Sequence, residues 1–332
     1  MQSFRLGILG AGKIACSMAE TVKKLNAAGN HEVILTAVGS RDLSKAQSFI
    51  KDHNLASCKA YASYLELVSA PDVDGIYVAT PHNFHKEHAL LAIKHSKHVL
   101  VEKSFTANLK EAQEVIKVAL EHKVTVTEAI WTRYQPMRSL VQNLLSSGII
   151  GTPTYISANL GYNISFKDRI VKPELAGGAL LDLGVYVLNF ALMFFGHPDN
   201  VEASAVKNAL GVDMQESISL SWNDGRMASL QATALAQSDR HGVIYGSKGF
   251  IEVDNVNNPE RCRVYDCNYN LMKTVERPQQ LTGFEYELLE WSHCALEHKN
   301  QCPSMSHDET LYIMGLMDSI RAQLGIKFPF EK

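Results

Sequence analysis

The chain has 332 residues, more than one hydrophobic core usually supports, so two domains are expected. With 46% hydrophobic and 20% charged residues, a net charge of −3 and no lysine or arginine block, its composition argues against nucleic acid or an anionic membrane as a partner. No apolar run approaches the roughly 20 residues that span a bilayer, the first strand begins too early for a signal peptide, and the six scattered cysteines fit reduced thiols in the cytoplasm.

The first predicted strand and helix enclose a glycine-rich turn. An apolar strand at 6–9 is followed by the pattern Gly-x-Gly-x-x-Ala over residues 10–15 and then by helical spacing. Gly10 permits the tight turn, Gly12 lets a pyrophosphate approach the backbone, and the helix start offers free N–H groups to the phosphates. An ordinary turn between a strand and a helix is the alternative. The cofactor contacts expected here are Gly10, Gly12, Lys13 and Ile14.

Alternating strands and helices fill the rest of the first half. Apolar strands are predicted at 31–38, 75–79, 98–101 and 124–127, and helices at 42–53, 64–69, 85–95 and 109–122. This alternation predicts a doubly wound parallel sheet of the Rossmann type, covered on both faces. Ligands of such sheets bind beyond the carboxyl ends of the strands. The glycine turn, Thr80-Pro81-His82 and Glu102-Lys103 all lie at such ends.

The residues at the end of the second predicted strand indicate whether the cofactor is NAD(H) or NADP(H). An NAD site places Asp or Glu there to hold the ribose hydroxyls. This chain instead has Ser40 and Arg41 at that place and Lys45 one helical turn later. Because a guanidinium binds phosphate in a bidentate way, these residues predict NADP(H) rather than NAD(H). The alternative is that Arg41 and Lys45 only solvate a helix and that Asp42 grips the ribose.

The second half changes character. From residue 150 onward, polar and apolar residues alternate in short runs at 154–159, 217–222, 227–232, 243–245, 249–253 and 262–265. Helices are predicted at 179–195, 285–298 and 307–324. We therefore expect a dinucleotide-binding domain over 1–130 and an α+β substrate and dimerisation domain over 131–304, with a large open, mainly antiparallel sheet. A partner subunit is the simplest cover for its second face, which predicts a homodimer.

Two distant segments carry candidate chemistry. Lys103 follows a strand end near the expected nicotinamide, while Asp182 and Tyr186 lie four residues apart and share a helix face. A tyrosine with a pKa of about 10 is a poor base near neutrality. An ammonium about 4 Å away can stabilise the phenolate by roughly 4 kcal/mol, so Lys103 could activate Tyr186 for proton transfer. Spacing alone cannot bring the two together, and each could be an ordinary surface or core residue.

Three histidines could suggest a metal site. His82, His85 and His88 are spaced three apart, so they fan around a helix start, and no acid or cysteine completes a ligand set. We expect no metal and place these residues in solvent or near the cofactor. The aromatic residues of 284–291 are expected in the core.

The glycine turn, Thr80-Pro81-His82-x-x-His85, Glu102-Lys103 and the segment 177–186 together resemble the glucose–fructose oxidoreductase/inositol dehydrogenase (Gfo/Idh/MocA) family. The resemblance implies that Lys103 and Tyr186 are the catalytic pair and that Asp182 lines the site. It also implies that the last helix, about 305–325, packs back on the nucleotide domain. Further substrate and cofactor residues implied by the resemblance are Trp131, Arg133, Arg169, Thr80, Pro81, His82, His85 and Glu102.

Within that family, the segments 128–133 and 181–186 resemble the branch that oxidises dihydrodiols or D-xylose with NADP. Inositol-type relatives have His where this chain has Tyr186, and many relatives carry proline where it has Ser104. The expected function is oxidation of a ring CH–OH, either the anomeric carbon of D-xylose or a trans-dihydrodiol, by NADP⁺. Rival interpretations are a dehydrogenase for another sugar or inositol-type polyol and a non-catalytic NADP-binding regulator.

Overall fold

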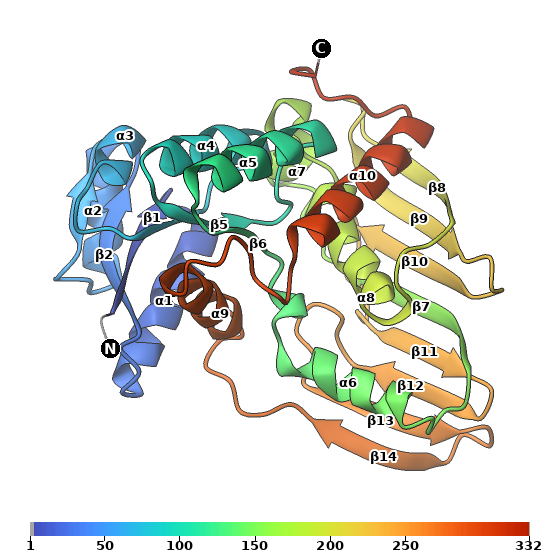
Figure 1. Ribbon diagram of the computed structural model, residues 1–332. Coiled ribbons are helices and arrows are strands. Elements are labelled where there is room, and N and C mark those ends of the chain that lie inside the picture. The colour runs from blue at the N-terminus through green and yellow to red at the C-terminus, as the bar shows by residue number, and fades with distance from the viewer. Residues whose placement is uncertain (1–2, 332) are drawn as a thin grey trace. The chain divides into compact units, whose positions relative to one another are not determined.

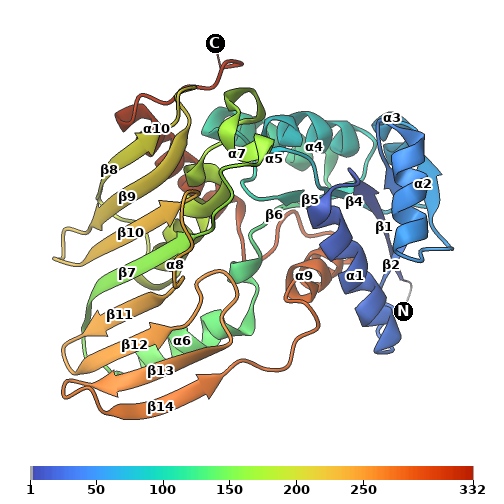
Figure 2. The ribbon, with the colours of Figure 1, turned by 180° about the vertical axis from the view of Figure 1, so that it is seen from behind.

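The computed structural model describes residues 3–331. Their contacts divide the chain into two compact units. One unit comprises Met1–Tyr134 and Gln280–Met314, and the other comprises Gln135–Gln279 and Gly315–Lys332. Figures 1 and 2 show the elements of both units from opposite sides.

The first unit contains a six-stranded parallel sheet with the order β3-β2-β1-β4-β5-β6. The strand order reverses direction between β1 and β4, and a ligand crevice is expected beyond the strand ends at such a reversal. The predicted doubly wound Rossmann sheet is confirmed. The strands are β1 (Phe4–Leu9), β2 (Val33–Gly39), β3 (Lys59–Tyr61), β4 (Gly75–Val78), β5 (His98–Glu102) and β6 (Val126–Ala129).

Helices cover both faces of this sheet. In both views α4 and α5 lie together on one face, and α1 and α9 lie together on the other. Because the strands are covered on both sides, their apolar residues are almost all buried, and every residue of β4 is buried. The helices are α1 (Lys13–Ala27), α2 (Leu43–Asp52), α3 (Tyr64–Val68), α4 (His85–Lys94), α5 (Leu109–His122) and α9 (Glu285–Leu296).

Helix α9, which the sequence analysis placed within 131–304, packs in the first unit. Its Trp291 side chain is fully buried and packs edge to face on Phe4 of β1, with 5.0 Å between the ring centroids. The expected core position is therefore confirmed for Trp291, whereas Phe284 is only partly buried. Helix α10 (His307–Gln323) is divided, with 307–314 in the first unit and 315–323 in the second.

The second unit contains an eight-stranded sheet with the order β14-β13-β12-β11-β7-β10-β9-β8. Strands β7 and β10 pair in parallel and the other neighbours pair antiparallel, so the prediction of a large, mainly antiparallel sheet is confirmed. The strands are β7 (Pro153–Gly161), β8 (Asn200–Lys207), β9 (Asp213–Ser221), β10 (Met227–Thr233), β11 (Gly242–Gly246), β12 (Gly249–Val253), β13 (Arg261–Asp266) and β14 (Leu271–Glu276).

One face of this sheet is covered by a buried helix. Helix α8 (Val185–Phe195) and the π-helix Leu180–Gly184 before it pack on β7 and β10. The helical stretch Pro173–Phe195 is long and apolar enough to cross a membrane by length and composition, which corrects the expectation that no apolar run approaches that length. However, 89% of its most apolar window is buried inside the protein, as in the core helix of a globular domain.

Several elements were not predicted. They are β3, β8, β14, α6 (Pro136–Ser146) and the short turns of helix at Asp168–Val171 and Pro173–Leu175. Strand β14 is almost entirely exposed and has no apolar alternation. Strand β8 does alternate over 200–205, but its inward residues are only partly buried and two of them are alanines, so its apolar signal is weak. Strand β3 has only three residues, too few to show a period.

Candidate active site

The glycine turn has the geometry that a dinucleotide phosphate needs. Gly10 has φ = +106°, and a Cβ there would lie 2.9 Å from the carbonyl oxygen of Ala79, so glycine is required for the turn itself. A Cβ at Gly12 would meet nothing within 4 Å, and no side chain caps helix α1 at this residue. Open space beside an uncapped helix N-terminus fits a pyrophosphate.

At the end of β2, Asp42 is already engaged. Its carboxylate caps α2 by accepting hydrogen bonds from Ser44 N–H (2.9 Å) and Ser44 Oγ (2.7 Å), which lowers the pKa of Asp42. Arg41 and Lys45 are exposed, and the Arg41 guanidinium lies 5.9 Å from the ring centroid of Phe84. Ser40 is buried, and its Oγ accepts the backbone N–H of Asp42 at 3.3 Å.

His82 joins the loops that follow β4 and β5, whereas His88 contacts the loop after β4 alone. His82 Nε2 lies 3.2 Å from the carbonyl oxygen of Lys103, and His88 Nδ1 lies 3.0 Å from Thr80 Oγ1. Burial lowers the pKa of His88 to about 4. Pro81, between these contacts, is exposed. Within residues 3–331, no three His, Cys, Asp or Glu side chains form a group that could hold a metal ion.

His85 is fully buried and bridges the two loops. Its Nδ1 lies 2.8 Å from the Ser104 carbonyl oxygen and its Nε2 2.7 Å from the Thr80 carbonyl oxygen. Only a protonated ring donates to both carbonyls, but burial is the larger influence and lowers the pKa of His85. The side chain presents no surface to a bound molecule, so in this structure it joins backbone segments.

The end of β5 carries Lys103. Glu102 is buried beside it and accepts hydrogen bonds from the Tyr77 hydroxyl and, at 3.2 Å, from the Lys103 backbone N–H. Lys103 is partly exposed, and its peptide bond to Ser104 is cis.

Glu128, at the end of the neighbouring strand β6, fixes the loop after Lys103. Its Oε1 accepts the Phe105 backbone N–H at 3.0 Å. Burial raises the pKa of Glu128 to about 7, although the nearby Arg133 and Lys103 cations oppose that effect. The same end of the sheet therefore holds a cation that the sequence predicted and a second acid that it did not.

Trp131 and Arg133 follow β6 in a short 3₁₀ turn. The Trp131 ring stacks on Phe284 with centroids 4.3 Å apart and planes inclined by 15°. The Arg133 side chain is 2% exposed and donates to Glu309 at 2.7 Å. In this structure Arg133 is thus a buried ion-pair partner, and a direct substrate contact stays a prediction.

In the second unit, Asp182 and Tyr186 lie on one continuous helical stretch. It begins as a π-helix over Leu180–Gly184 and continues as α8, whereas an α-helix was expected throughout. π-Helical turns are rare and often mark functional sites. Asp182 is buried and forms an ion pair with Arg169, whose side chain is 44% exposed; Tyr186 is 8% exposed. The two predicted residues Arg169 and Asp182 are therefore in contact.

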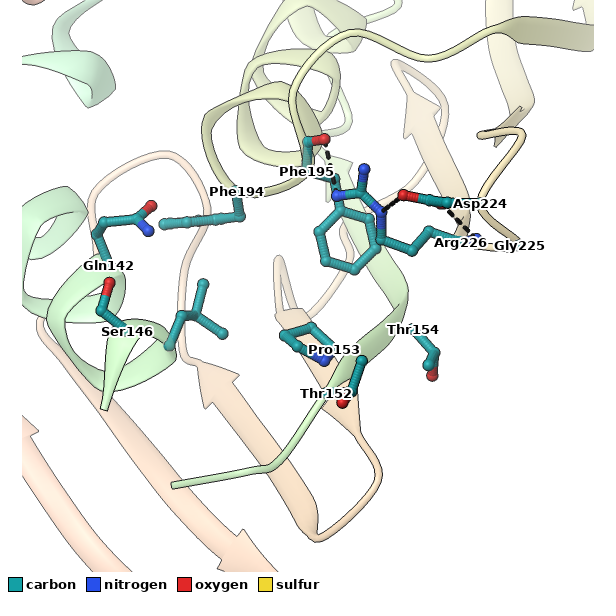
Figure 3. A pocket seen from close by; sticks show the side chains of 11 residues that line it. Gln142, Ser146, Thr152, Pro153, Thr154, Phe194, Phe195, Asp224, Gly225 and Arg226 are labelled. Atoms are coloured by element: carbon teal, nitrogen blue, oxygen red, sulfur yellow. Dashed lines mark hydrogen bonds and ion pairs between the residues drawn. The ribbon is translucent and has the colours of Figure 1, made fainter. Parts of the chain in front are cut away.

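The predicted residues fall into two groups. Those of the nucleotide edge, together with Lys103, Trp131 and Arg133, belong to the first unit, and Arg169, Asp182 and Tyr186 belong to the second. A separate pocket of the second unit, in Figure 3, is bounded by α6, the start of β7, the end of α8 and the turn before β10. None of the predicted residues lines it, and its Arg226 is held by Asp224 and by the carbonyl oxygen of Phe195.

Family models match both units. Residues 4–130 match the model described as "Oxidoreductase family, NAD-binding Rossmann fold", and residues 139–252 match the GFO/IDH/MocA C-terminal domain. The chain belongs to the Gfo/Idh/MocA family. The resemblance that its motifs carry is thereby confirmed, and the protein is an NAD(P)-dependent oxidoreductase.

Two curated dehydrogenases resemble this chain over nearly its whole length. The trans-1,2-dihydrobenzene-1,2-diol dehydrogenase of Xenopus tropicalis is 34% identical, covering 97% of this chain and 98% of the relative. The scyllo-inositol 2-dehydrogenase (NADP(+)) IolU of Bacillus subtilis is 31% identical, covering 99% of each.

Two solved structures share the fold of this chain. KijD10, a 3-ketoreductase from Actinomadura kijaniata in complex with NADP and TDP-benzene, superposes with a TM-score of 0.83 at 22% identity, covering 97% of this chain and 98% of that one. UDP-N-acetylglucosamine 3-dehydrogenase GnnA from Acidithiobacillus ferrooxidans gives a TM-score of 0.78 at 20% identity with the same coverage.

Sequence reasoning missed several residues around the site. Phe284 was assigned to the core, and Glu128 and Glu309 were not singled out. Glu309 lies 176 positions from its partner Arg133, so no local spacing could reveal the pair. A signal did exist for Glu128, because an acid at the end of an apolar strand is rare in a buried sheet.

Proposed function

We propose that this protein is an NADP-dependent dehydrogenase that oxidises a ring CH–OH, with a trans-dihydrodiol or the anomeric carbon of D-xylose as substrate. The observation that carries this substrate class is the similarity to trans-1,2-dihydrobenzene-1,2-diol dehydrogenases over nearly the full length of both chains. Tyr186, which separates this branch from relatives with histidine at that position, supports the same choice.

The residues at the nucleotide edge fit NADP(H). The open space at Gly12 and the uncapped start of α1 suit the pyrophosphate. Asp42 is occupied as the cap of α2, so it is not disposed to hold a ribose hydroxyl, whereas Arg41 is exposed beside it. An exposed guanidinium at this strand end favours a ribose phosphate. Related IolU is named as NADP-dependent.

In the proposed reaction, Tyr186 takes the proton of the substrate hydroxyl and Lys103 stabilises the developing oxyanion. When bound, NADP⁺ accepts the hydride that leaves the carbinol carbon. Lys103 also favours the phenolate form of Tyr186, because an ammonium close to a phenol stabilises its anion. The proposal requires both head groups to reach the same substrate carbon.

Aromatic and charged side chains suit a cyclic polyhydroxylated substrate. The Trp131–Phe284 stack offers an apolar wall for the C–H face of a diol or sugar ring. The Arg169–Asp182 pair offers a donor and an acceptor for a second hydroxyl group. Arg133, buried against Glu309, is proposed to hold the turn that carries Trp131.

A substrate panel tests this function. Purified protein is incubated with NADP⁺ and either a trans-dihydrodiol, D-xylose or scyllo-inositol, and NADPH absorbance is followed. We expect turnover of a dihydrodiol or D-xylose. Tyr186→Phe should lower kcat by about 10²- to 10⁴-fold, the usual contribution of a general acid or base. Binding of NADPH, measured by fluorescence, should be unchanged.

Tyr269→Phe is the matched control, since this tyrosine is 80% exposed and lies in the loop between β13 and β14. Turnover of scyllo-inositol alone would favour the polyol alternative. If NADP(H) binds but no substrate turns over, and if Tyr186→Phe changes nothing measurable, the protein is instead a nucleotide-binding regulator.

We also propose a homodimer formed through the open face of the eight-stranded sheet. Directly paired positions of five strands place Met227, Tyr155, Tyr245, Phe250 and Tyr265 in one row. Met227, Tyr155 and Tyr245 are exposed at 46%, 37% and 37%, an apolar row that a second subunit would bury. A cytoplasmic location remains part of the proposal.

A further inference from the structure

Two buried acids lie beneath the π-helix of the second unit. Asp213 and Glu216 are the first and fourth residues of β9 and are 1% and 2% exposed. Residues three apart on a regular strand point to opposite faces. Here the ladder with β8 contains a bulge, in which Lys207 pairs with Asp213 and Val206 with Gln215. The extra residue turns both acids toward the covered face of the sheet.

Asp213 binds the start of the helical stretch. Its Oδ2 accepts the backbone N–H of Leu180 at 2.7 Å, and the Ala179 N–H is a further donor to this carboxylate. A Cβ at Gly178 would lie 2.3 Å from Asp213 Oδ1, so only glycine admits the acid at this distance. Burial raises the pKa of Asp213, but the hydrogen bonds from Leu180 and Ala179 oppose that effect. Unpaired N–H groups at a helix start and the helix dipole also favour a negative charge there, so Asp213 is the member of the pair that ionises first.

Glu216 has the opposite surroundings. Both of its carboxyl oxygens are buried, and neither accepts a hydrogen bond. A Cβ at Gly184 would lie 3.1 Å from Glu216 Oε2, so this acid sits directly under the end of the π-helix. Burial and the charge of Asp213 raise the pKa of Glu216 well above its ordinary range. The side chains of Asp213 and Glu216 are hydrogen-bonded to each other, which requires a proton on one of them. Two carboxyl groups in contact cannot both be ionised at low cost, so Glu216 retains its proton and donates it to Asp213.

We propose that Asp213 and Glu216 share one proton and act as positioning residues, which fix the π-helical segment Leu180–Gly184 and thereby aim Asp182 and Tyr186. Asp213 holds the beginning of this segment and Glu216 supports its end, and Asp182 lies between the two contacts. The effect of this pair on catalysis rests on the proposed function. Its support of the π-helix is independent of that function.

The test compares Asp213→Asn, Glu216→Gln and Glu216→Leu with wild type, and Glu202→Gln, an exposed acid of β8, is the control. Two readouts are used: hydrogen–deuterium exchange of a peptide spanning 178–190, and kcat together with the dissociation constant of NADPH. An amide has one acceptor oxygen where a carboxylate has two. Asp213→Asn should therefore leave one donor unpaired and speed exchange by about tenfold, as expected for a lost hydrogen bond to a charged group.

Glu216→Gln should match wild type, because its amide N–H can donate to Asp213, whereas Glu216→Leu should exchange as fast as Asp213→Asn. The fast-exchanging variants should lose about tenfold in kcat while NADPH binding is unchanged. Equal exchange in wild type and Asp213→Asn, or equal behaviour of Glu216→Gln and Glu216→Leu, would overturn the pair. If wild type turns over no substrate, the proposed function fails and the exchange measurement alone decides whether the pair supports the π-helix.

Discussion

At the scale of single residues, Asp42 separates two interpretations that the sequence left open. The same Asp could hold a ribose or cap a helix, and both functions need only one acid near the end of β2. In the structure its carboxylate accepts both the N–H and the hydroxyl of Ser44. The neighbouring Arg41 then becomes the side chain of this strand end on which cofactor choice should depend.

Arg41→Ala tests that dependence. Loss of a charge-assisted hydrogen bond to a ribose phosphate costs about 1.5–3 kcal/mol, so the KM for NADP⁺ should rise roughly 10- to 100-fold. The KM for NAD⁺ should stay constant because NAD⁺ lacks that phosphate. Lys51→Ala, at the far end of α2, is the control. A similar loss for both cofactors would show that Arg41 only supports the fold.

Candidate site residues could be proposed where a local sequence pattern marks them. Contacts between residues far apart in the sequence could not be predicted. The glycine turn, Arg41 and Lys103 follow strand ends and could be recognised from spacing. His85 was assigned to the cofactor, yet its two contacts are the carbonyls of Thr80 and Ser104, which no periodicity identifies. The stack of Phe284 on Trp131 joins residues on opposite sides of the second unit's sequence.

At the scale of elements, strong apolar strands gave a correct sheet, while exposed or very short strands did not. The helix at 179–195 was predicted, but its first turn is a π-helix. Every residue from Leu180 to Leu192 is buried, so the segment has no polar face from which a helical period could be measured. Its unusual turn is linked to contacts with β9, a strand more than 20 residues away in sequence.

The glycine turn before α1 provides a matched pair of substitutions. Gly10→Ala should destabilise the protein by about 1–3 kcal/mol, because a left-handed φ and the Ala79 carbonyl oppose a Cβ. Gly12 has φ = −93° and open space where a Cβ would lie, so Gly12→Ala should unfold at the wild-type temperature. The added methyl group would occupy the space of the pyrophosphate, so this variant should bind NADPH much more weakly. Thermal unfolding without cofactor and NADPH fluorescence separate the two effects. Normal NADPH affinity in Gly12→Ala would place the pyrophosphate elsewhere.

At the scale of the whole molecule, the open sheet determines the expected association. The exposed row that includes Tyr155 and Tyr245 crosses the central strands, and a charge inside a buried interface would be costly. Sedimentation of wild type should give a dimer, and Tyr245→Glu should shift it to monomer. Leu120→Glu, at an exposed position of α5 in the first unit, should remain dimeric. A monomeric wild type would remove the proposed dimer without affecting the family assignment.

The assignment of 280–314 to the first unit and of 315–332 to the second has a practical consequence for dissecting this enzyme. The polypeptide passes from one unit to the other after Tyr134, after Gln279 and again after Met314. No single cleavage or gene truncation can therefore release either half intact. A fragment ending at Tyr134 would lack α9 and with it the Trp291 side chain that packs on Phe4, so the nucleotide-binding half has to be studied within the complete chain.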